Sequence, residues 1–311
     1  MSDLSFGLKL PNCGGILCPP DWATPETVAD LAHLADTYQY DSVWFQDHLL
    51  TPAELRHLGQ LRFYEPLITA AALAGRFPSL TFGIATIILP LREPVLLAKQ
   101  MAVFDAFFPG RLKVGFGTGR YESEFDAFGA SWSDRGRTAD EYLELVAALL
   151  TEEEVTRTGT RAVTSAVMSP RTEDVRRLMW VGGTAAPVLR RTARYGSGWI
   201  CAAITPEEVA GYVGRLHDMI RAEGRNPAEL RVALSTTIRR NATGDRTDDH
   251  SIHRHSTALA GSDEEIQQTL RAHVDAGVTD FLVTFDEPDL DRLQGAAAWF
   301  GSDVVPSLRS H

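Results

Sequence analysis

Lysine is scarce in this sequence. Of the 30 basic residues only Lys9, Lys99 and Lys113 are lysines. The formal net charge is −11 and the arginines are scattered, so the chain lacks the basic stripe that a nucleic-acid-binding surface needs. Long apolar runs are also absent, since no stretch approaches the roughly 18 consecutive apolar residues of a membrane-spanning helix. We therefore expect no nucleic-acid partner and no membrane span.

Cysteine is sparse as well. Cys13 and Cys18 lie close together in the sequence, and Cys201 lies far from both. A disulfide framework would need more cysteines, and one pair without a second is poor evidence for a zinc site. The N-terminal segment contains an early acid and no apolar stretch of signal-peptide length. These features predict free thiols in a cytoplasmic protein.

The sequence does contain enough apolar material for a large core. Hydrophobic residues make up 44% and aromatic residues 9% of the 311 residues. No segment has the composition of an interdomain linker. We therefore predict a single globular domain of enzyme size over residues 1–311.

Short apolar runs alternate with amphipathic stretches of helical length along the whole chain. The strand candidates are residues 5–10, 42–46, 81–89, 112–116, 179–182, 198–202, 231–237 and 280–285. The helix candidates are residues 25–38, 65–76, 94–107, 138–151, 185–195, 206–223, 263–276 and 289–306. Thr24 and Ser262 are expected to cap two of these helices.

Eight strand–helix units in succession predict an α/β fold of the (β/α)8 TIM-barrel type. The strands lack strict polar alternation, as expected of parallel strands that are covered on both faces. An open doubly wound sheet is the alternative, although it does not so naturally use eight units. The segment 152–178 is too long for a simple connection, and we expect it to be an excursion over the top face of the barrel.

In a barrel, catalytic residues belong at the carboxyl ends of the strands. Asp47 and His48 directly follow the second predicted strand. Histidine is the usual acid–base side chain near neutral pH, and a neighbouring carboxylate can orient it. The alternative is an aspartate that caps the next turn beside an exposed histidine.

The third strand carries small residues within a β-branched run, namely Gly83, Ala85 and Thr86. Small residues inside a strand permit a bulge or the close approach of a flat ligand. Ordinary packing at the narrow mouth of a barrel is the alternative.

The fourth strand ends in alternating glycines, Gly115, Gly117 and Gly119. They would keep one face of the chain bare, so that a planar ring could lie against it. The spacing is not the Rossmann fingerprint, and no Walker lysine is present. Glu122 and Glu124, just beyond, are typical of first-turn helix acids rather than of catalysts.

After the fifth strand, Gly182, Gly183 and Thr184 open directly into a predicted helix. Free backbone N–H groups, a hydroxyl and the positive end of the helix dipole form an anion site suited to a phosphate. The alternative is a tight turn in which Thr184 is the N-cap.

Three histidines, His250, His253 and His255, lie close to two aspartates in a polar segment without periodicity. A metal site is conceivable there, but such a segment is more typical of a lid or a solvated loop. We therefore predict no metal.

Several blocks, taken together and in order, resemble the luciferase-like monooxygenase superfamily, which includes bacterial luciferase and deazaflavin-dependent reductases. They are DSVWFQDHLL, FGIATIILPLREPVLLAKQ, FFPGRLKVGFGTGRYESEFDAFG followed by RGRTADEYLELV, WVGGTAAPVLRRTARYGSGWI and DAGVTDFLV. The resemblance spans nearly the whole chain.

The resemblance implies a TIM barrel that holds reduced FMN or the deazaflavin coenzyme F420 at its top face, and a homodimer. Asp47 and His48 match the active-site end of strand two. Ala85 and Thr86 match a bulge that often contains a non-prolyl cis peptide behind the ring. The resemblance assigns Gly117, Thr118 and Gly119 to the cofactor wall. It assigns Gly182, Gly183 and Thr184 to the phosphate-side turn.

The sequence also departs from the family pattern. Gly117 and Thr118 stand where bacterial luciferase carries a reactive cysteine and a phosphate-binding arginine, so light emission is not expected. Arg120 or the turn at Gly183 and Thr184 would then have to contact the cofactor phosphate.

These observations lead to the hypothesis of a coenzyme F420-dependent oxidoreductase that transfers hydride to or from a small organic substrate. His48 would exchange a proton with the substrate, Asp47 would set its tautomer and charge, and the segments 152–178 and 239–260 would cover the substrate. An FMNH2-dependent monooxygenase is the close alternative. A metal-dependent barrel hydrolase and a flavin-binding barrel without activity remain as further alternatives.

Overall fold

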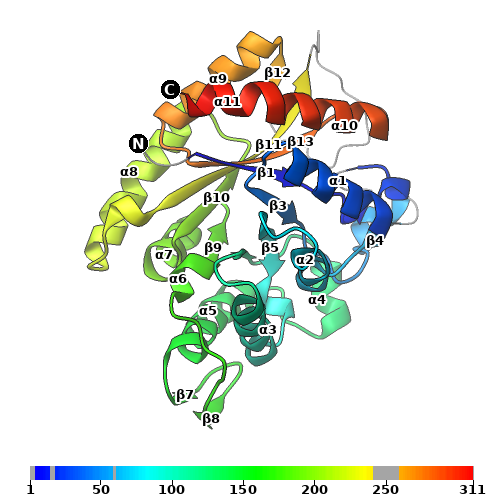
Figure 1. The fold of residues 1–311 in the computed structure, drawn as a ribbon. Coiled ribbons are helices and arrows are strands. Elements are labelled where there is room, and N and C mark those ends of the chain that lie inside the picture. The colour runs from blue at the N-terminus through cyan, green and yellow to red at the C-terminus, as the bar shows by residue number, and fades with distance from the viewer. Residues whose placement is uncertain (1–3, 15–17, 59–60, 241–258, 311) are drawn as a thin grey trace.

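A closed barrel of eight parallel strands forms the centre of the protein (Figure 1). The computed structural model describes residues 4–14, 18–58, 61–240 and 259–310. In order around the barrel the strands are β1 (Ser5–Lys9), β3 (Ser42–Phe45), β5 (Thr81–Ile88), β6 (Leu112–Gly117), β9 (Met179–Gly182), β10 (Gly198–Ala202), β11 (Arg231–Arg240) and β13 (Asp280–Phe285). β10 pairs with β11 and β13 pairs with β1, so no edge of this sheet is open. The predicted TIM barrel is confirmed.

The predicted strands agree with the observed ones to within three residues at each end. β11 is three residues longer than predicted because it continues beyond β13 to pair with β12 (Leu259–Gly261). A two-stranded antiparallel pair, β2 (Cys13–Gly14) and β4 (Arg62–Phe63), joins the loops that follow β1 and β3.

Helices surround the barrel as an outer layer. They are α1 (Pro25–Thr37), α2 (Pro66–Ala74), α3 (Pro94–Phe107), α4 (Glu122–Phe128), α5 (Arg135–Thr151), α7 (Ala186–Tyr195), α8 (Pro206–Ala222), α9 (Asp263–Asp275), α10 (Leu290–Trp299) and α11 (Val305–Arg309), the last two joined by a π-helical turn over Phe300–Val304. The expected caps are present: the Thr24 side chain accepts a hydrogen bond from the Thr27 N–H, and Ser262 forms a capping box with Glu265. No helix within the described ranges is long and apolar enough to cross a membrane.

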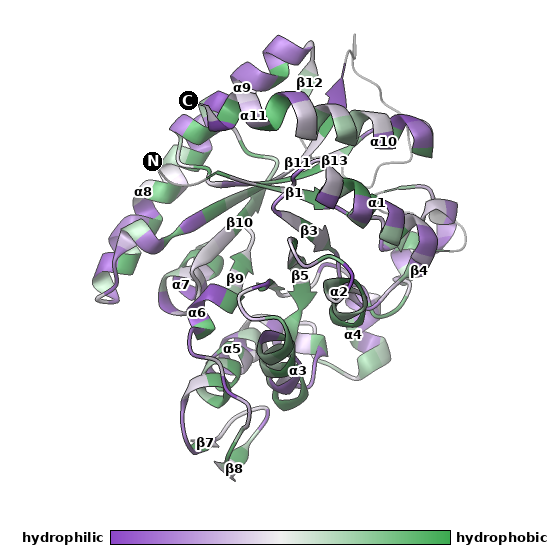
Figure 2. Cartoon of the chain, in the orientation of Figure 1, coloured by the Kyte–Doolittle hydropathy of each residue, from purple (hydrophilic) through white to green (hydrophobic). Residues whose placement is uncertain are grey.

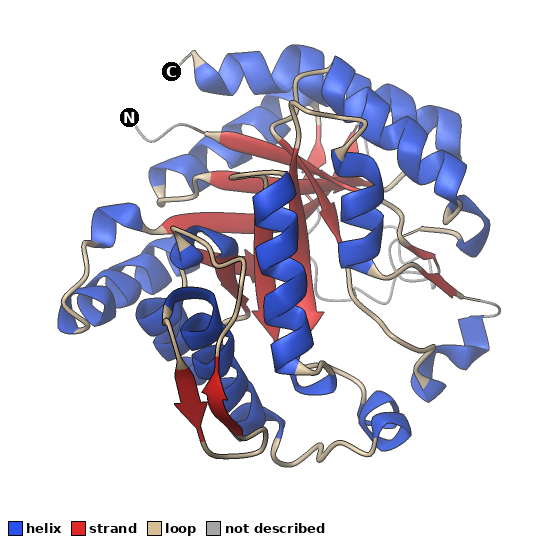
Figure 3. Cartoon of the chain, turned by 60° about the horizontal axis from the view of Figure 1, so that its bottom comes forward, coloured by secondary structure: helices blue, strands red, loops and turns tan. Residues whose placement is uncertain are grey.

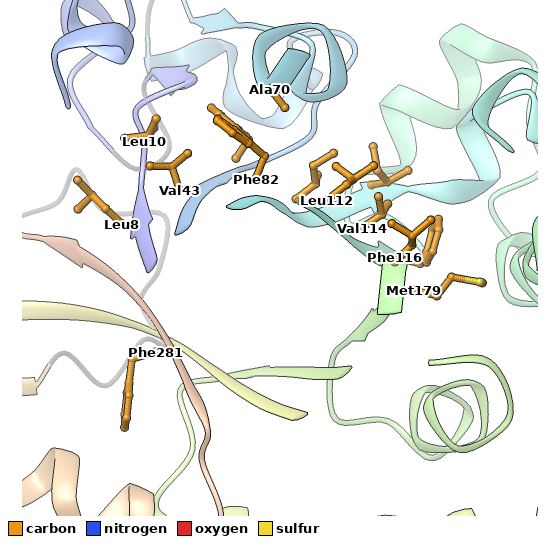
Figure 4. Close-up of a cluster of buried hydrophobic side chains, with 14 of the residues drawn as sticks. Leu8, Leu10, Val43, Ala70, Phe82, Leu112, Val114, Phe116, Met179 and Phe281 are labelled. Atoms are coloured by element: carbon orange, nitrogen blue, oxygen red, sulfur yellow. The ribbon is translucent and has the colours of Figure 1, made fainter. Parts of the chain in front are cut away.

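Two apolar layers stabilise the barrel. The larger lies between the strands and the helices and includes Phe82, Val114 and Phe116 (Figure 4). The smaller fills the barrel interior and consists of Trp44, Trp180, Ile200, Ala233 and Leu282. The two indoles meet edge to face at 5.9 Å between centroids, so the interior is packed rather than open.

The segment 152–178 forms an excursion, as predicted, but not over the top face. It contains the antiparallel strands β7 (Val155–Arg157) and β8 (Val163–Ala166) and the short helix α6 (Val175–Leu178). Near its tip the Thr160 N–H donates to Glu141 Oε2 at 2.7 Å, and Arg161 pairs with Glu93 at 2.6 Å. Figures 1 and 3 show the hairpin outside the helical layer.

The expected position of the excursion was wrong for a topological reason. A helix that follows a strand runs back toward the amino ends of the strands, so a segment that follows α5 leaves from the end opposite the top face. The hairpin then lies along α5, where its polar tip finds acidic partners. The tip contacts α5 and the start of α3 rather than His48. The other expected cover, 239–260, lies mostly outside the described residues, as do His250, His253 and His255.

Candidate active site

The carboxyl ends of the strands meet at one end of the barrel, which we call the mouth. His48 lies there, three residues beyond the end of β3, and its side chain is 13% exposed. Its ring contacts two aromatic rings, with centroid distances of 5.2 Å to Phe63 and 5.7 Å to Tyr121. The histidine is therefore positioned by packing and still reaches solvent at the mouth.

Glu124, and not Asp47, is the carboxylate that contacts His48. Its Oε2 lies 2.9 Å from His48 Nδ1, and its side chain is only 1% exposed. Glu124 is in the first turn of α4, as predicted for a helix acid, but this turn faces the mouth. The carboxylate fixes the ring orientation and leaves Nε2 without a hydrogen-bond partner among the described residues.

Asp47 points away from His48, so its predicted role in setting the histidine tautomer is wrong. Its carboxylate accepts hydrogen bonds from the Ile88 N–H at 2.8 Å and from Arg92 Nη2 at 2.5 Å. Burial raises the pKa of Asp47, while Arg92 acts in the opposite direction. Arg92 also pairs with Glu65 at 2.8 Å, so Asp47 anchors the loop after β5 to the end of β3 and to the start of α2.

The bond between Ala85 and Thr86 is cis, as the resemblance implied. The β5–β6 register shifts at this point, between Ile84 and Ile87, which confirms the predicted bulge. Ala85 packs against the interior cluster, so this peptide lies at the inner wall of the mouth.

The glycines of neighbouring strands make room for Thr86 instead of leaving a bare face. A Cβ at Gly117 would lie 2.3 Å from Thr86 Oγ1, and one at Gly182 would lie 2.5 Å from Thr86 Cγ2. A Cβ at Gly115 would lie 2.6 Å from Ile200 Cδ1 and 3.2 Å from Thr86 Cγ2. The expectation that the fourth strand offers a bare surface to a planar ring is therefore wrong, because the Thr86 side chain occupies that space.

Beyond β6 the chain turns sharply toward α4. Gly119 has a positive φ of 83°, and a Cβ there would lie 2.7 Å from the Phe125 ring. Thr118 is partly exposed, and the exposed Arg120 places its guanidinium 5.8 Å from the Tyr121 ring centroid. Arg120 has no ion pair within the described ranges, so its charge at the rim of the mouth is available to an anion.

The turn after β9 also lies at the mouth. Gly183 has a positive φ of 117° and donates its N–H to the Ile200 carbonyl at 2.9 Å. Thr184 is partly exposed, and the N-cap of α7 is Ala185 rather than Thr184. No side chain caps this helix, but Pro187 has no N–H and the Val188 N–H donates to the Ala185 carbonyl at 2.8 Å. Within this turn the Ala186 N–H is therefore the one that is open to a bound anion.

Two polar residues inside the mouth were not predicted from the sequence. Lys9 ends β1 and donates from Nζ to Ser235 Oγ at 3.1 Å. Gln46 follows β3, and its buried Oε1 has no hydrogen-bond partner among the described residues. The scarcity of lysine could have singled out Lys9, since one of only three lysines lies at a strand end.

A pocket of about 370 Å³ lies elsewhere, between the start of α3, the α4–α5 loop and α5. It includes Arg92 and Tyr142 but neither His48 nor Thr86, so the residues predicted to act together lie outside it. Among the residues described, no group of three or more histidine, cysteine or acidic side chains is arranged to hold a metal ion.

The family assignment comes from the sequence. The family model of the luciferase-like monooxygenases matches residues 5–243, from the start of β1 to just beyond the end of β11. The chain belongs to the luciferase-like monooxygenase family. The match includes Glu124 as well as the predicted residues at the ends of β3, β5, β6 and β9.

Curated relatives of this luciferase-like chain are distant. An uncharacterized protein of Mycobacterium tuberculosis is 29% identical over 172 residues, which cover 55% of this chain and 59% of that protein. The alkanal monooxygenase alpha chain of Photorhabdus luminescens is 28% identical over 137 residues, which cover 43% of this chain and 36% of that one. Each match spans less than two thirds of the length of the relative.

Solved structures match this luciferase-like chain over its whole length. An F420-dependent secondary alcohol dehydrogenase in complex with an F420–acetone adduct gives a TM-score of 0.81, with 98% of this chain and 99% of that chain covered. The two sequences are 16% identical, so the likeness shows the shared fold alone.

Proposed function

We propose that this protein is a coenzyme F420-dependent oxidoreductase that transfers hydride to or from a small organic substrate. The observation that carries the proposal is the His48–Glu124 pair at the barrel mouth, in a chain of the luciferase-like family. A histidine held at Nδ1 by a buried carboxylate can donate or accept a proton at Nε2.

The cofactor-binding residues in this proposal surround the mouth on three strands. Ala85 and Thr86 would back the ring, with Gly117, Thr118, Gly119 and Gly182 shaping the wall around the Thr86 side chain. The Ala186 N–H at the start of α7, together with the turn at Gly183 and Thr184 and with Arg120, would bind the phosphate. When bound, the reduced deazaflavin would supply the hydride for substrate reduction, and the oxidised form would accept it in the reverse direction.

The protein would supply position and proton transfer. His48 Nε2 would exchange a proton with the substrate oxygen as the substrate is reduced or oxidised. Glu124 would act as a positioning residue, because its carboxylate holds the ring orientation and stabilises the protonated imidazole. The Phe63 and Tyr121 rings that contact it would hold the imidazole in position.

An FMNH2-dependent monooxygenase is the second candidate, supported by the similarity to the alkanal monooxygenase alpha chain. We prefer the deazaflavin because Gly117 and Thr118 replace the cysteine and arginine expected of a luciferase.

Anaerobic titration with reduced coenzyme F420 and with reduced FMN, followed by an oxygen-uptake assay, tests the proposal. We expect tight binding of reduced F420 and no oxygen consumption. Tight binding of reduced FMN with oxygen uptake would support the monooxygenase instead. If neither cofactor binds, both candidates are wrong.

A further inference from the structure

The amine of Lys9 lies inside the mouth of the barrel. Gly7, two residues earlier on β1, faces the interior, because a Cβ there would lie 2.4 Å from Trp44 Nε1. Side chains two residues apart on a strand point to the same face, so Lys9 also faces inward. Its hydrogen-bond partner Ser235 likewise lies two residues beyond the interior residue Ala233.

This amine has no carboxylate partner within the described ranges. The other interior lysine, Lys113, pairs with Asp280 at 3.1 Å at the opposite end of the barrel. Burial lowers the pKa of Lys9 to about 8, and no charged group contributes to that shift. A buried ammonium without a counter-charge is costly, so an anion that enters the mouth would gain a strong partner.

A second unsatisfied group lies on the neighbouring strand. Gln46 is the first residue beyond β3, two positions after the interior residue Trp44. Its Oε1 is buried and has no hydrogen-bond partner among the described residues. A buried acceptor that stays unpaired is unfavourable, which indicates that a bound molecule completes this site.

Lys9 and Gln46 lie across the mouth from the proposed phosphate turn. In the order of strands around the barrel, β1 is separated from β9 by β3, β5 and β6 on one side and by β13, β11 and β10 on the other. A cofactor held against β5, β6 and β9 would leave the β1–β3 side of the mouth to the substrate.

We propose that Lys9 binds an anionic oxygen of the substrate, so that the substrates of this enzyme are small carboxylates or phenolates. The Lys9 ammonium donates to the anionic oxygen, and Gln46 Oε1 accepts a hydrogen bond from a neighbouring N–H or O–H of the same molecule. This inference rests on the proposed function, because that function places the cofactor on the opposite wall.

Calorimetric titration of the full-length protein with two matched pairs of probes tests the proposal. Benzoate is compared with neutral benzamide, and 2,4-dinitrophenolate with neutral 2,4-dinitroanisole, below the pH at which Lys9 loses its proton. We expect at least one anion to bind about tenfold or more tightly than its neutral partner, and the preferred pair identifies carboxylate or phenolate.

Lys9→Met should abolish this preference, whereas Lys99→Met, which removes an exposed lysine on α3, should retain it. Lys9→Gln serves as a second neutral variant if Lys9→Met does not fold. The proposal is wrong if neither anion is preferred by the wild type, or if a folded neutral Lys9 variant keeps the preference. Neither pair of binding measurements requires cofactor or turnover. A negative result would therefore contradict only the role of Lys9 and would leave the result of the cofactor titration valid.

Discussion

At the scale of single residues, the two neighbours Asp47 and His48 perform different tasks. His48 faces the mouth and contacts Glu124, whereas Asp47 turns away and joins Arg92. Adjacent residues beyond a strand end need not share a face, so sequence proximity is a weak guide to which carboxylate serves a histidine. The contact that does serve it joins residues 76 positions apart.

Glu124→Gln should lower kcat by at least about tenfold with little change in KM, because the neutral amide cannot stabilise a charged imidazole. His48→Ala should cost about 100-fold or more, and adding Glu124→Gln to His48→Ala should have no further effect, since the carboxylate acts through the histidine. Steady-state kinetics of the two single variants and the double variant measure this coupling. Additive losses would show that Glu124 acts independently of His48.

Asp47→Asn should lower the free energy of unfolding by about 3 kcal/mol, because it leaves Arg92 without its buried charged partner. The variant should keep much of its kcat once it is folded, since Asp47 does not touch His48. Urea unfolding and single-temperature kinetics provide the two measurements. A large loss of kcat in a variant that remains stably folded would show that Asp47 does contribute to catalysis.

Lys9→Met should raise the free energy of unfolding by about 2 kcal/mol near neutral pH. The pKa of Lys9 is about 8 in the folded protein and 10.5 for the free side chain. Between pH 8 and pH 10.5 the Lys9 amine is therefore protonated in the unfolded chain and largely neutral in the folded protein. Wild-type stability therefore rises across that interval, and the advantage of the variant should shrink toward alkaline pH. Urea unfolding at several pH values tests this, with Lys99→Met as the control. A difference in unfolding free energy between Lys9→Met and the wild type that does not change with pH would contradict this prediction.

At the scale of elements, the mouth is shaped by a bulge and the glycines that accommodate it. The Thr86 side chain projects from β5 into space that Gly117 and Gly182 leave open on β6 and β9. The glycines therefore serve the packing of the protein itself before they serve any ligand. The alternating glycines in the sequence indicated that some group lies close to the backbone of these strands. That this group is the Thr86 side chain follows from the geometry of the bulge in β5, which the sequence alone does not reveal.

Gly117→Ala should lower the free energy of unfolding by about 1–3 kcal/mol, since the new methyl group would overlap Thr86 Oγ1. In a Thr86→Ala background the cost should be smaller, because the overlapping atom is gone. Denaturant unfolding of the four proteins in this cycle gives the coupling. Gly214→Ala on α8, where nothing lies within 4 Å, is the control and should be neutral or slightly stabilising. If Gly117→Ala lowers the free energy of unfolding equally in the wild type and in the Thr86→Ala variant, the proposed overlap with Thr86 is wrong.

The barrel itself could be predicted from the sequence, because parallel strands covered on both faces leave short, continuous apolar runs. The end of β3 could also be singled out, since the fold places chemistry at strand ends. Glu124 could not, because an acid in the first turn of a helix is usually exposed. The hairpin at 152–178 was misplaced because it leaves α5 at the end opposite the mouth and then packs against α5 and the start of α3, contacts that no local pattern reveals.

At the scale of the whole molecule, one side of the helical layer remains apolar. On α3 the side chains of Leu96, Val103 and Phe107 are 56%, 37% and 76% exposed, and Ile68 on α2 is 67% exposed. Figure 2 shows α2 and α3 as predominantly hydrophobic helices. They follow the neighbouring strands β3 and β5, so we propose that a second copy of the chain covers this face in a homodimer.

Phe107→Glu should convert the proposed dimer into a monomer, because a carboxylate would be buried in an apolar interface. Phe128→Glu, on α4 outside this face, is the matched control and should leave the dimer intact. Light scattering coupled to size-exclusion chromatography measures the mass of each. A wild-type protein that is monomeric, or a Phe107→Glu variant that stays dimeric, would contradict the proposed interface.

The three lysines divide the molecule into zones that an amine-reactive reagent would distinguish. Lys99 is exposed on α3, between Leu96 and Val103 on the same helical face; Lys9 lies in the mouth, and Lys113 lies inside the barrel beside Asp280. Acetylation mapped by mass spectrometry would therefore report subunit contact at Lys99 and occupancy of the mouth at Lys9, with Lys113 as an internal reference. Because the chain has only three lysines, each acetylated lysine reports the accessibility of one known site.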